Sequence, residues 1–318
     1  MDPEERAILI ATLGRLATAF DGVELTKALD DFGIRDVLAG SPREAVSGLF
    51  AAMGRAGSMA AALQDVLAIH LPGAAGHSVV LPFMGRSRVG TFERGAVTMR
   101  GLVVGGHTAD ALLVPVDSAG ETVWVRPLEP MTSRVISGLD PELRLTEVTA
   151  FACRAEVTLD GRAAAESRQA VVAAARRALG YQIVGAAGRM IELAVDHARD
   201  RRQFGRPIGS FQAVRHRLAD AYVAREGATA ALDAAWDADD EELAAMLAKS
   251  LAGRAARIAA TQCQQVLAGV GFTAEHPFHR FLARTVVLDR IAGSATELPG
   301  LIGARIAATG AIPRLVEL

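Results

Sequence analysis

The sequence predicts a mainly helical protein in which a small β domain lies between an N-terminal helical domain and a C-terminal helical bundle. Apolar residues recur at three- and four-residue steps up to about residue 69 and again after residue 163. Short β-rich runs divided by Gly, Pro and Asp lie between them, with no strand–helix–strand alternation and no internal repeat. We therefore expect domains at 1–72, 73–161 and 162–318, with ample apolar material for a core because 51% of the 318 residues are hydrophobic.

The first two domains are predicted from a change of period. Apolar residues on helical stripes include Ile8, Leu13, Leu16, Ala17, Leu49, Met53, Leu63 and Leu67. Pro72, Gly73 and Gly76 then end the helical pattern, and the runs VTMRGLVV, ALLVPV and TVWVRPL are typical of strands. The clearest strand is 151–159, whose expected buried face is Phe151, Cys153, Ala155, Val157 and Leu159.

The C-terminal bundle is predicted from long single stripes. The first helix carries Val172, Leu179, Ile183, Met190 and Ala194, which spans roughly seven turns. Gly180, Gly185 and Gly188 lie inside it, and each costs about 1 kcal/mol relative to alanine, so we expect another backbone to approach there. Two more helices follow, with the stripes Phe211, Val214, Leu218, Ala221, Ala228, Leu232 and Leu243, Leu247, Leu251, Ile258.

Composition and short motifs exclude several kinds of function. The net charge of −2 predicts no attraction to nucleic acid or to an anionic membrane, and the acidic start MDPEERAILI is no secretory signal, so we expect a soluble cytoplasmic protein. Cys153 and Cys263 form no metal-type pair, and Pro277 interrupts the helix that Glu275, His276 and His279 would need to bind a metal. The glycine-rich run GLVVGGHTAD at 101–110 is more typical of a hairpin than of a dinucleotide loop.

The segment DRRQFGRPIGSFQAVRHRLAD at 200–220 joins the first two bundle helices. Gly205 and Pro207 stop a helix, and Ser210 is suited to start the next one. Arginines, a glutamine and an aromatic ring at one turn suit a phosphate-bearing aromatic ligand. On composition alone they also fit a solvated helix end whose arginines complement the helix dipole.

This segment resembles the acyl-CoA dehydrogenase family, whose bundle has an R-x-[QTA]-F-G turn followed by a Phe-Gln pair, as in RRQFGRPIGSFQ. The segment QQVLAGVGFTAEHPFHRFLAR at 264–284 similarly looks like the family's Q-x-x-G-G-x-G-[FY]-x-x-E-x-P pattern. The resemblance is strong in the C-terminal half and covers the first 160 residues in outline. It implies the acyl-CoA dehydrogenase fold, with N-terminal helices, a β barrel or sheet and a four-helix bundle.

The resemblance also implies FAD as cofactor. The residues that would reach across a subunit interface to the ADP half of a neighbour's FAD are Arg201, Gln203, Phe204, Gln212, Gln265, Gly269 and Gly271. Guanidinium suits the diphosphate, the amides suit ribose or adenine edges, and glycine lets the backbone approach. The family's first glycine of the G-G pair is replaced by Ala268.

The catalytic glutamate of that family has no counterpart here. In the family a glutamate removes the α-proton while hydride leaves the β-carbon for the flavin. Its two known positions correspond to Ala292 and Ala175, and Asp289 and Glu297 only flank the first. The family's T-E-P-x-x-G-S-D segment is also unmatched, because the nearest candidate, PFMGRSRVG at 82–90, lacks both carboxylates.

Three hypotheses follow for the function. The first is a non-catalytic subunit of a heterotetramer, as in bacterial family members that act on steroid side chains, paired with a second acyl-CoA dehydrogenase-like chain. The substrate would be an acyl-CoA thioester, and the acceptor an electron-transfer flavoprotein or a similar protein. The second is a homomeric dehydrogenase whose base is Glu297 or Asp289. The third is a scaffold subunit without flavin. No catalytic residue in this chain is assigned, and the acyl group is left open.

Overall fold

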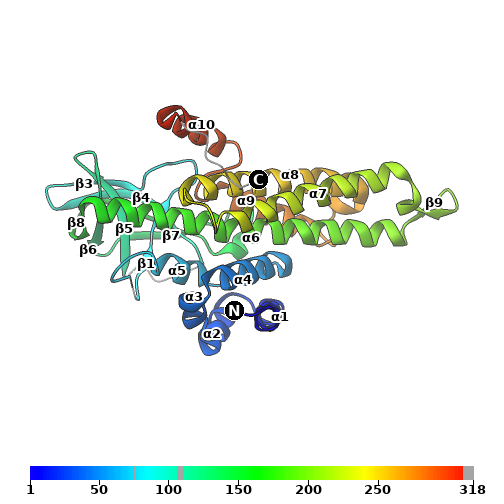
Figure 1. The fold of residues 1–318 in the computed structure, drawn as a ribbon, viewed down its shortest axis with the longest axis horizontal. Coiled ribbons are helices and arrows are strands. Elements are labelled where there is room, and N and C mark those ends of the chain that lie inside the picture. Colours follow the sequence, from blue (N-terminus) through cyan, green and yellow to red (C-terminus); the bar gives the residue numbers. More distant parts are fainter. Residues whose placement is uncertain (75, 106–110, 311–318) are drawn as a thin grey trace.

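A computed structural model describes residues 1–74, 76–105 and 111–310. One long helix, α6 (Gly161–Asp200), runs along most of the molecule. A β domain lies at one end of α6, the N-terminal helices pack along one side, and the other bundle helices pack along the opposite side (Figure 1). The mainly helical fold with a small β domain agrees with the sequence prediction.

The N-terminal region forms five helices within the described residues. They are α1 (Pro3–Ala19), α2 (Gly22–Phe32), α3 (Ile34–Gly40), α4 (Pro42–Ala56) and α5 (Ala62–Ala68). Helix α1 starts with a capping box, in which Asp2 and Glu5 satisfy each other's backbone N–H groups. Leu13 and Ala17 are buried as predicted, whereas Ile8 is 61% exposed because Leu9 occupies the inward position of that turn.

The β domain is built from β1 (Ser78–Val79), β2 (Leu81–Pro82), β3 (Gly90–Glu93), β4 (Ala96–Val103), β5 (Leu112–Ser118), β6 (Glu121–Pro127), β7 (Thr132–Val135) and β8 (Thr146–Leu159), with the short helix η1 (Pro141–Leu143) before β8. The sheet order is β2-β4-β3-β5-β6-β8-β7, and an additional pairing of β4 with β8 closes a ring around an apolar interior. The hairpin expected at 101–110 lies only partly within the described residues. Its start, up to Val103, forms the end of β4.

The predicted buried face of β8 is only partly correct. Cys153 and Ala155 are buried, but Phe151 is 90% exposed and Val157 is 43% exposed. Ala152 has φ +51°, and the register against β4 shifts at this point, which makes a β-bulge. The extra residue reverses which side chains face the core, so Val148 is buried before the bulge and Cys153 after it.

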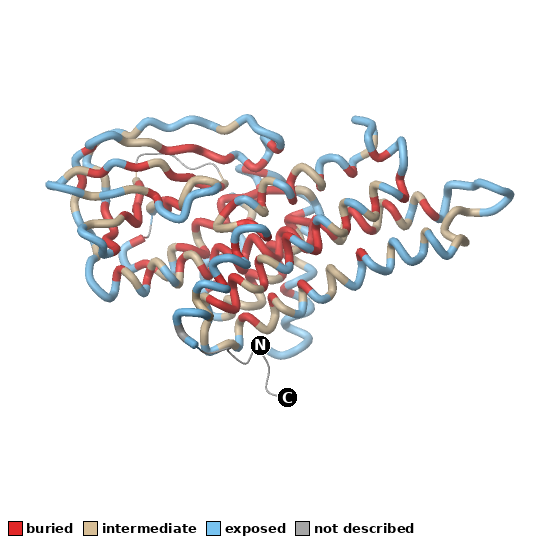
Figure 2. The backbone as a smooth tube through the Cα atoms, turned by 90° about the horizontal axis from the view of Figure 1, so that it is seen from above, coloured by how far each residue is buried: buried red, intermediate tan, exposed pale blue. Residues whose placement is uncertain are grey.

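The C-terminal bundle consists of α6, α7 (Gln212–Ala234), α8 (Glu241–Leu267) and α9 (Phe278–Arg290), with α10 (Leu298–Thr309) beside it. Strands β9 (Arg202–Gln203) and β10 (Arg206–Pro207) and the short helix η2 (Ile208–Ser210) connect α6 to α7, and η3 (Ala268–Phe272) follows α8. Figure 2 shows the core as a buried band along the middle of these helices. Among the described residues, no helix combines the length and hydrophobicity that crossing a bilayer requires.

Small residues make the helix contacts tighter than the predicted stripes imply. On α6, Leu179, Ile183, Met190 and Ala194 are buried as predicted. On α8, Leu251 is 41% exposed, and the buried face is a run of alanines such as Ala248, Ala252 and Ala259. The α7 stripe is buried only from Ala221 onward. Alanine lets neighbouring backbones approach, so the inward face of α8 is a small-residue face.

Of the three interior glycines of α6, Gly185 confirms the expected approach of another backbone, whereas Gly180 and Gly188 face side chains. A Cβ at Gly185 would overlap the carbonyl oxygen of Ala51 on α4, and a Cβ at Gly54 of α4 would overlap the carbonyl oxygen of Gln182. The backbones of α4 and α6 therefore meet at these two positions. Gly180 makes room for Leu232 of α7.

Candidate functional site

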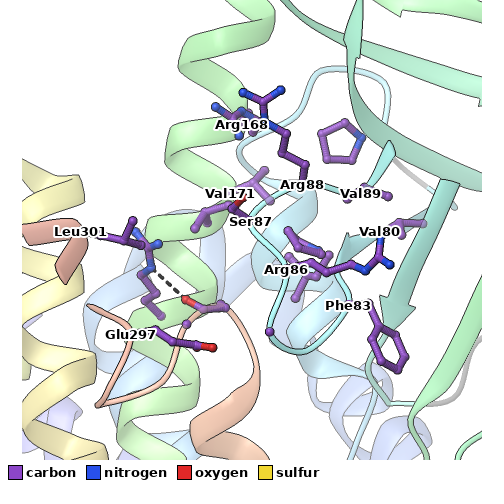
Figure 3. A pocket seen from close by; sticks show the side chains of 18 of the residues that line it. Val80, Phe83, Arg86, Ser87, Arg88, Val89, Arg168, Val171, Glu297 and Leu301 are labelled. Carbon is purple, nitrogen blue, oxygen red and sulfur yellow. Dashed lines mark hydrogen bonds between the residues drawn. The ribbon is translucent and has the colours of Figure 1, made fainter. Parts of the chain in front are cut away.

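A cavity of about 510 Å³ lies between the β domain and the bundle. Most of its lining comes from the loop after β2, one face of α6, and the turn between α9 and α10, with further residues from β5, α8 and the start of α10. Figure 3 shows Arg168 and Val171 extending from α6 near the loop that carries Arg86 and Arg88, with Glu297 and Leu301 on another side. The size is that of a small-molecule site.

The sequence positions that were compared with the family's flavin and base segments meet at this cavity. Segment 82–90 contributes most of its residues to one wall, and Ala292 and Gly293 contribute to another. Arg176, the neighbour of Ala175, hydrogen-bonds through Nε to the carbonyl oxygen of Ala292 at 3.1 Å. The two positions of the absent glutamate are thus connected through one arginine.

The carboxylates near Ala292 are both engaged in holding the turn. Glu297 Oε2 accepts hydrogen bonds from the Ser294 backbone N–H at 3.0 Å and from the Ser294 hydroxyl at 2.8 Å. The backbone hydrogen bond from Ser294 is the main reason why the pKa of Glu297 is lowered. Asp289 Oδ1 accepts from the Ala295 N–H at 3.0 Å. A carboxylate with a lowered pKa is a weak general base.

Lys249 supports the same turn from within the bundle. Its side chain is fully buried, and Nζ donates to the carbonyl oxygens of Asp289 at 3.1 Å and of Gly293 at 3.3 Å. Burial lowers the pKa of Lys249 to about 8, which the nearby Asp289 carboxylate partly opposes. Sequence reasoning did not find this contact, although Lys249 stands out as one of only two lysines and interrupts a run of alanines.

The predicted FAD-contacting turn lies at the other end of the bundle. β9 and β10 form a two-residue hairpin through Phe204 and Gly205, which have φ +54° and +77°. Positive φ at both central residues defines a type I′ turn, which suits the glycine and strains the phenylalanine. Phe204 is 92% exposed and meets Phe211 edge to face with ring centroids 6.1 Å apart.

The remaining predicted contact residues lie around this hairpin and η3. Arg201, at the C-terminus of α6, is exposed, as are Gln203, Gln212, Gln265 and Gly269. Gly271 is buried, and a Cβ there would crowd the Gln264 side chain and the Cβ of Leu267, so packing within the chain favours glycine at this position. Gly269 has open space around its Cα.

The hairpin and the cavity cannot serve the same small ligand within one chain. Arg176 lines the cavity, and Arg201 follows it 25 residues later along α6. At 1.5 Å per residue, the two arginines are separated by roughly 38 Å. In Figure 1, β9 lies at the opposite end of the molecule from the β domain.

The described residues give no indication of a metal site. They contain no group of three or more His, Cys, Asp or Glu side chains placed to hold an ion. His276 Nδ1 accepts from the Phe278 N–H, and His279 Nδ1 contacts the His276 carbonyl oxygen at 2.8 Å. Local backbone contacts thus occupy both histidines.

Comparisons with known proteins agree with this architecture. Residues 165–307 match the family model described as the acyl-CoA dehydrogenase C-terminal domain. Acyl-CoA dehydrogenase IpdE2 of Mycobacterium tuberculosis is 34% identical over 182 residues, which cover 57% of this chain and 52% of that protein. Acyl-CoA dehydrogenase FadE34 of the same organism is 36% identical over 197 residues, covering 58% of this chain and 26% of that protein. The chain thus spans about half or less of these relatives.

Solved structures extend the likeness to nearly the whole fold. A chain of the ChsE4–ChsE5 complex from Mycobacterium tuberculosis matches with a TM-score of 0.80 at 22% identity, covering 98% of this chain and 99% of that chain. A chain of the Tcur3481–Tcur3483 steroid acyl-CoA dehydrogenase matches with a TM-score of 0.79 at 21% identity, covering 97% and 99%. At these identities the structures show a shared fold. The sequence match thus makes residues 165–307 similar to the C-terminal domain of acyl-CoA dehydrogenases, and the structures extend the likeness in fold to nearly the whole chain.

Proposed function

We propose that this chain is the non-catalytic subunit of a two-chain acyl-CoA dehydrogenase and that it completes the ADP half of an FAD site formed mainly by its partner. The main observation in support is that the exposed hairpin around Arg201 lies far from the chain's own cavity. A group bound at the hairpin must therefore have its other half in another subunit. The partner would be a second acyl-CoA dehydrogenase-like chain.

The hairpin residues fit the ADP half of FAD. Arg201 is an exposed guanidinium at the end of α6, where it can meet a diphosphate, and Phe204 offers a flat apolar face. Gln203, Gln212 and Gln265 supply amides for ribose or adenine edges, and the open space at Gly269 admits close approach. Bound FAD would supply the hydride acceptor for α,β-dehydrogenation of an acyl-CoA thioester.

The proton of that reaction would be removed by the partner. Ala292 and Ala175 carry no carboxylate, and Glu297 is held by Ser294 with a lowered pKa. A homomeric enzyme with Glu297 or Asp289 as base is therefore the weaker alternative. Placing the base elsewhere by even ~1 Å costs about a hundredfold in rate.

Three properties of the relatives support the proposal. The curated relatives are named acyl-CoA dehydrogenases. One structural neighbour is a two-chain complex, and its matched chain is covered over 99% of its length. Another is named a steroid acyl-CoA dehydrogenase. We infer an acyl-CoA substrate, an acceptor such as an electron-transfer flavoprotein, and action in the cytoplasm.

Purification of the tagged chain from its native host tests the proposal directly. We expect a second acyl-CoA dehydrogenase-like chain to co-purify, with flavin absorbance and acyl-CoA oxidation present only in the complex. A yellow, active preparation of this chain alone would favour the homomeric alternative. A complex that never contains flavin would favour a scaffold.

Arg201→Ala tests the hairpin's role within that complex. Loss of a hydrogen bond to a charged group costs about 1.5–3 kcal/mol, so FAD should bind roughly 10–150 times more weakly. Arg199→Ala is the matched control, because Arg199 is exposed in the last turn of the same helix. Equal flavin retention in the two variants would contradict the assignment.

A further inference from the structure

The cavity beside Ala292 has an excess of positive charge. Its charged lining residues are Arg86, Arg88, Arg168, Arg176, Arg290, Asp117, Glu242 and Glu297. Each carboxylate is already engaged: Asp117 pairs with Arg88, Glu242 with Arg305, and Glu297 accepts from Ser294. Among the described residues, this leaves the other four lining arginines without an ion-pair partner within 4.0 Å. A cavity that is short of anions favours an anionic occupant.

Arg176 is the most deeply buried of these arginines. Only 7% of the residue is exposed, and within the described part of the chain its one hydrogen bond runs from Nε to the carbonyl oxygen of Ala292. Nη1 is buried and has no hydrogen-bond partner among the described residues. Burial lowers the pKa of Arg176 to about 10. A buried cation with an unused donor is costly, which is why such groups usually have an anionic partner.

Arg168 adds a second under-bonded cation on the same face of α6. It lies two turns before Arg176, and Val172 lies between them on the cavity wall. Its buried Nε also lacks a hydrogen-bond partner among the described residues. The two arginines repel each other, and the repulsion from Arg168 contributes to lowering the pKa of Arg176. An oxyanion placed beside both would relieve this repulsion and satisfy unused donors.

The rest of the cavity is largely apolar. Its apolar lining includes Val80, Leu81, Phe83, Val89, Val116, Val171, Val172 and Leu301. These side chains come from the β domain, from α6 and from α10, so they surround the space from several sides. An inorganic anion would leave this surface in contact with water. A ligand with an anionic head and an apolar body would cover it.

We propose that this cavity binds an amphipathic organic oxyanion, a carboxylate or a phosphate monoester, with its head beside Arg168 and Arg176 and its body against the valines of α6 and the β domain. The site would be separate from the FAD-contacting hairpin, and the inference does not depend on the hairpin's function. It gives a chain without a catalytic base a ligand site of its own.

Isothermal titration calorimetry on the full chain, in the assembly in which it purifies, tests the proposal. The probes are octanoate, octyl phosphate, inorganic phosphate and octanol. We expect octanoate or octyl phosphate to bind, with inorganic phosphate and octanol at least about tenfold weaker. The first two probes distinguish a carboxylate from a phosphate head. Equal binding of octanol would overturn the ionic part of the proposal, and no binding of either amphiphile would overturn all of it.

Variants of the two arginines locate the binding site. Arg176→Gln and Arg168→Gln should each weaken binding of the preferred probe about tenfold or more. Arg162→Gln removes the same charge from the exposed start of α6 and should leave binding unchanged. If Arg176→Gln does not fold, the half-buried Arg168 still provides the test. The proposal would be overturned if the Arg168 variant bound the probe as well as the parent. It would also be overturned if the variant lost bound flavin while its affinity for the probe stayed the same.

Discussion

Glu297 is the residue that decides between a catalytic and a non-catalytic chain. Its Oε2 caps the turn at Ser294, and a glutamine can accept the same hydrogen bonds through its amide oxygen. We therefore expect Glu297→Gln to leave turnover of the assembled enzyme within about threefold, because loss of a true base costs roughly 10²–10⁴. Abolished turnover at constant flavin content would make this chain the catalyst.

Asp289 is a poorer probe of the same question. Its carboxylate lies 3.9 Å from the buried Nζ of Lys249 and accepts from Ala295. Asp289→Asn would leave that lysine less well compensated, so a loss of activity could come from a loosened turn. The corresponding glutamate of the partner, changed to glutamine, is the informative comparison for Glu297→Gln.

Ala268 shows where a family glycine has been replaced at a structural cost. It has φ +52° and ψ −134°, a region that favours glycine strongly. We expect Ala268→Gly to raise the free energy of unfolding by about 1 kcal/mol in urea titrations. The matched control is Ala219→Gly, at an exposed position inside α7, which should lower stability by about 1 kcal/mol. A loss of stability in both variants would show that position 268 is unstrained.

The individual residues that sequence reasoning found and missed differ in a physical way. Arg201 and Phe204 belong to a contiguous turn, so their pattern is visible in the chain itself. Arg176 was noticed only as the neighbour of Ala175, because its unused donor arises from packing against residues more than a hundred positions away. Lys249 was missed for the same reason, since its two acceptors belong to the end of α9 and to the turn that follows it.

Secondary-structure elements were predictable where one period holds along the whole element. The α6 stripe satisfies this condition: four of its five predicted residues are buried, and the fifth, Val172, is half-buried at the cavity wall. β8 does not satisfy it, because the bulge at Ala152 switches which alternate residues face the core partway along the strand. A search for simple two-residue alternation cannot detect such an inserted residue. α8 differs in another way: Leu243 of its predicted stripe is buried, but Leu251 is exposed and alanines form most of the inward face.

The contact between α4 and α6 gives a prediction at the scale of elements. Gly185→Ala would place a methyl group on the carbonyl of Ala51, and neither backbone can move aside without separating the helices. We expect a loss of at least about 1–3 kcal/mol, measured as a lower melting temperature. Gly227→Ala on exposed α7 has open space and should stabilise the chain by about 0.5–1 kcal/mol. If Gly185→Ala stabilised the chain as much as Gly227→Ala does, the close approach of the α4 and α6 backbones would be contradicted.

The whole molecule presents its two candidate sites at opposite ends of α6. The cavity is lined by the β domain, α6 and the turn after α9, whereas the hairpin around Phe204 is exposed to solvent. Sequence order alone could predict the three-part architecture. It could not predict this separation, which depends on α6 continuing unbroken for 40 residues despite its interior glycines.

Under the proposed function, this separation would make retention of FAD depend on subunit association. If Arg201 and Phe204 contact a flavin held mainly by the partner, then each subunit alone offers only part of the site, and the exposed Phe204 loses its apolar contact. Gel filtration of the complex at decreasing concentrations, with flavin absorbance and activity recorded on each fraction, should show FAD, activity and the assembled species disappearing together. Arg201→Ala should shift the loss of FAD to higher protein concentrations. FAD that stays with a dissociated partner at unchanged affinity would contradict the shared site, because the hairpin of this chain would then contribute nothing to binding.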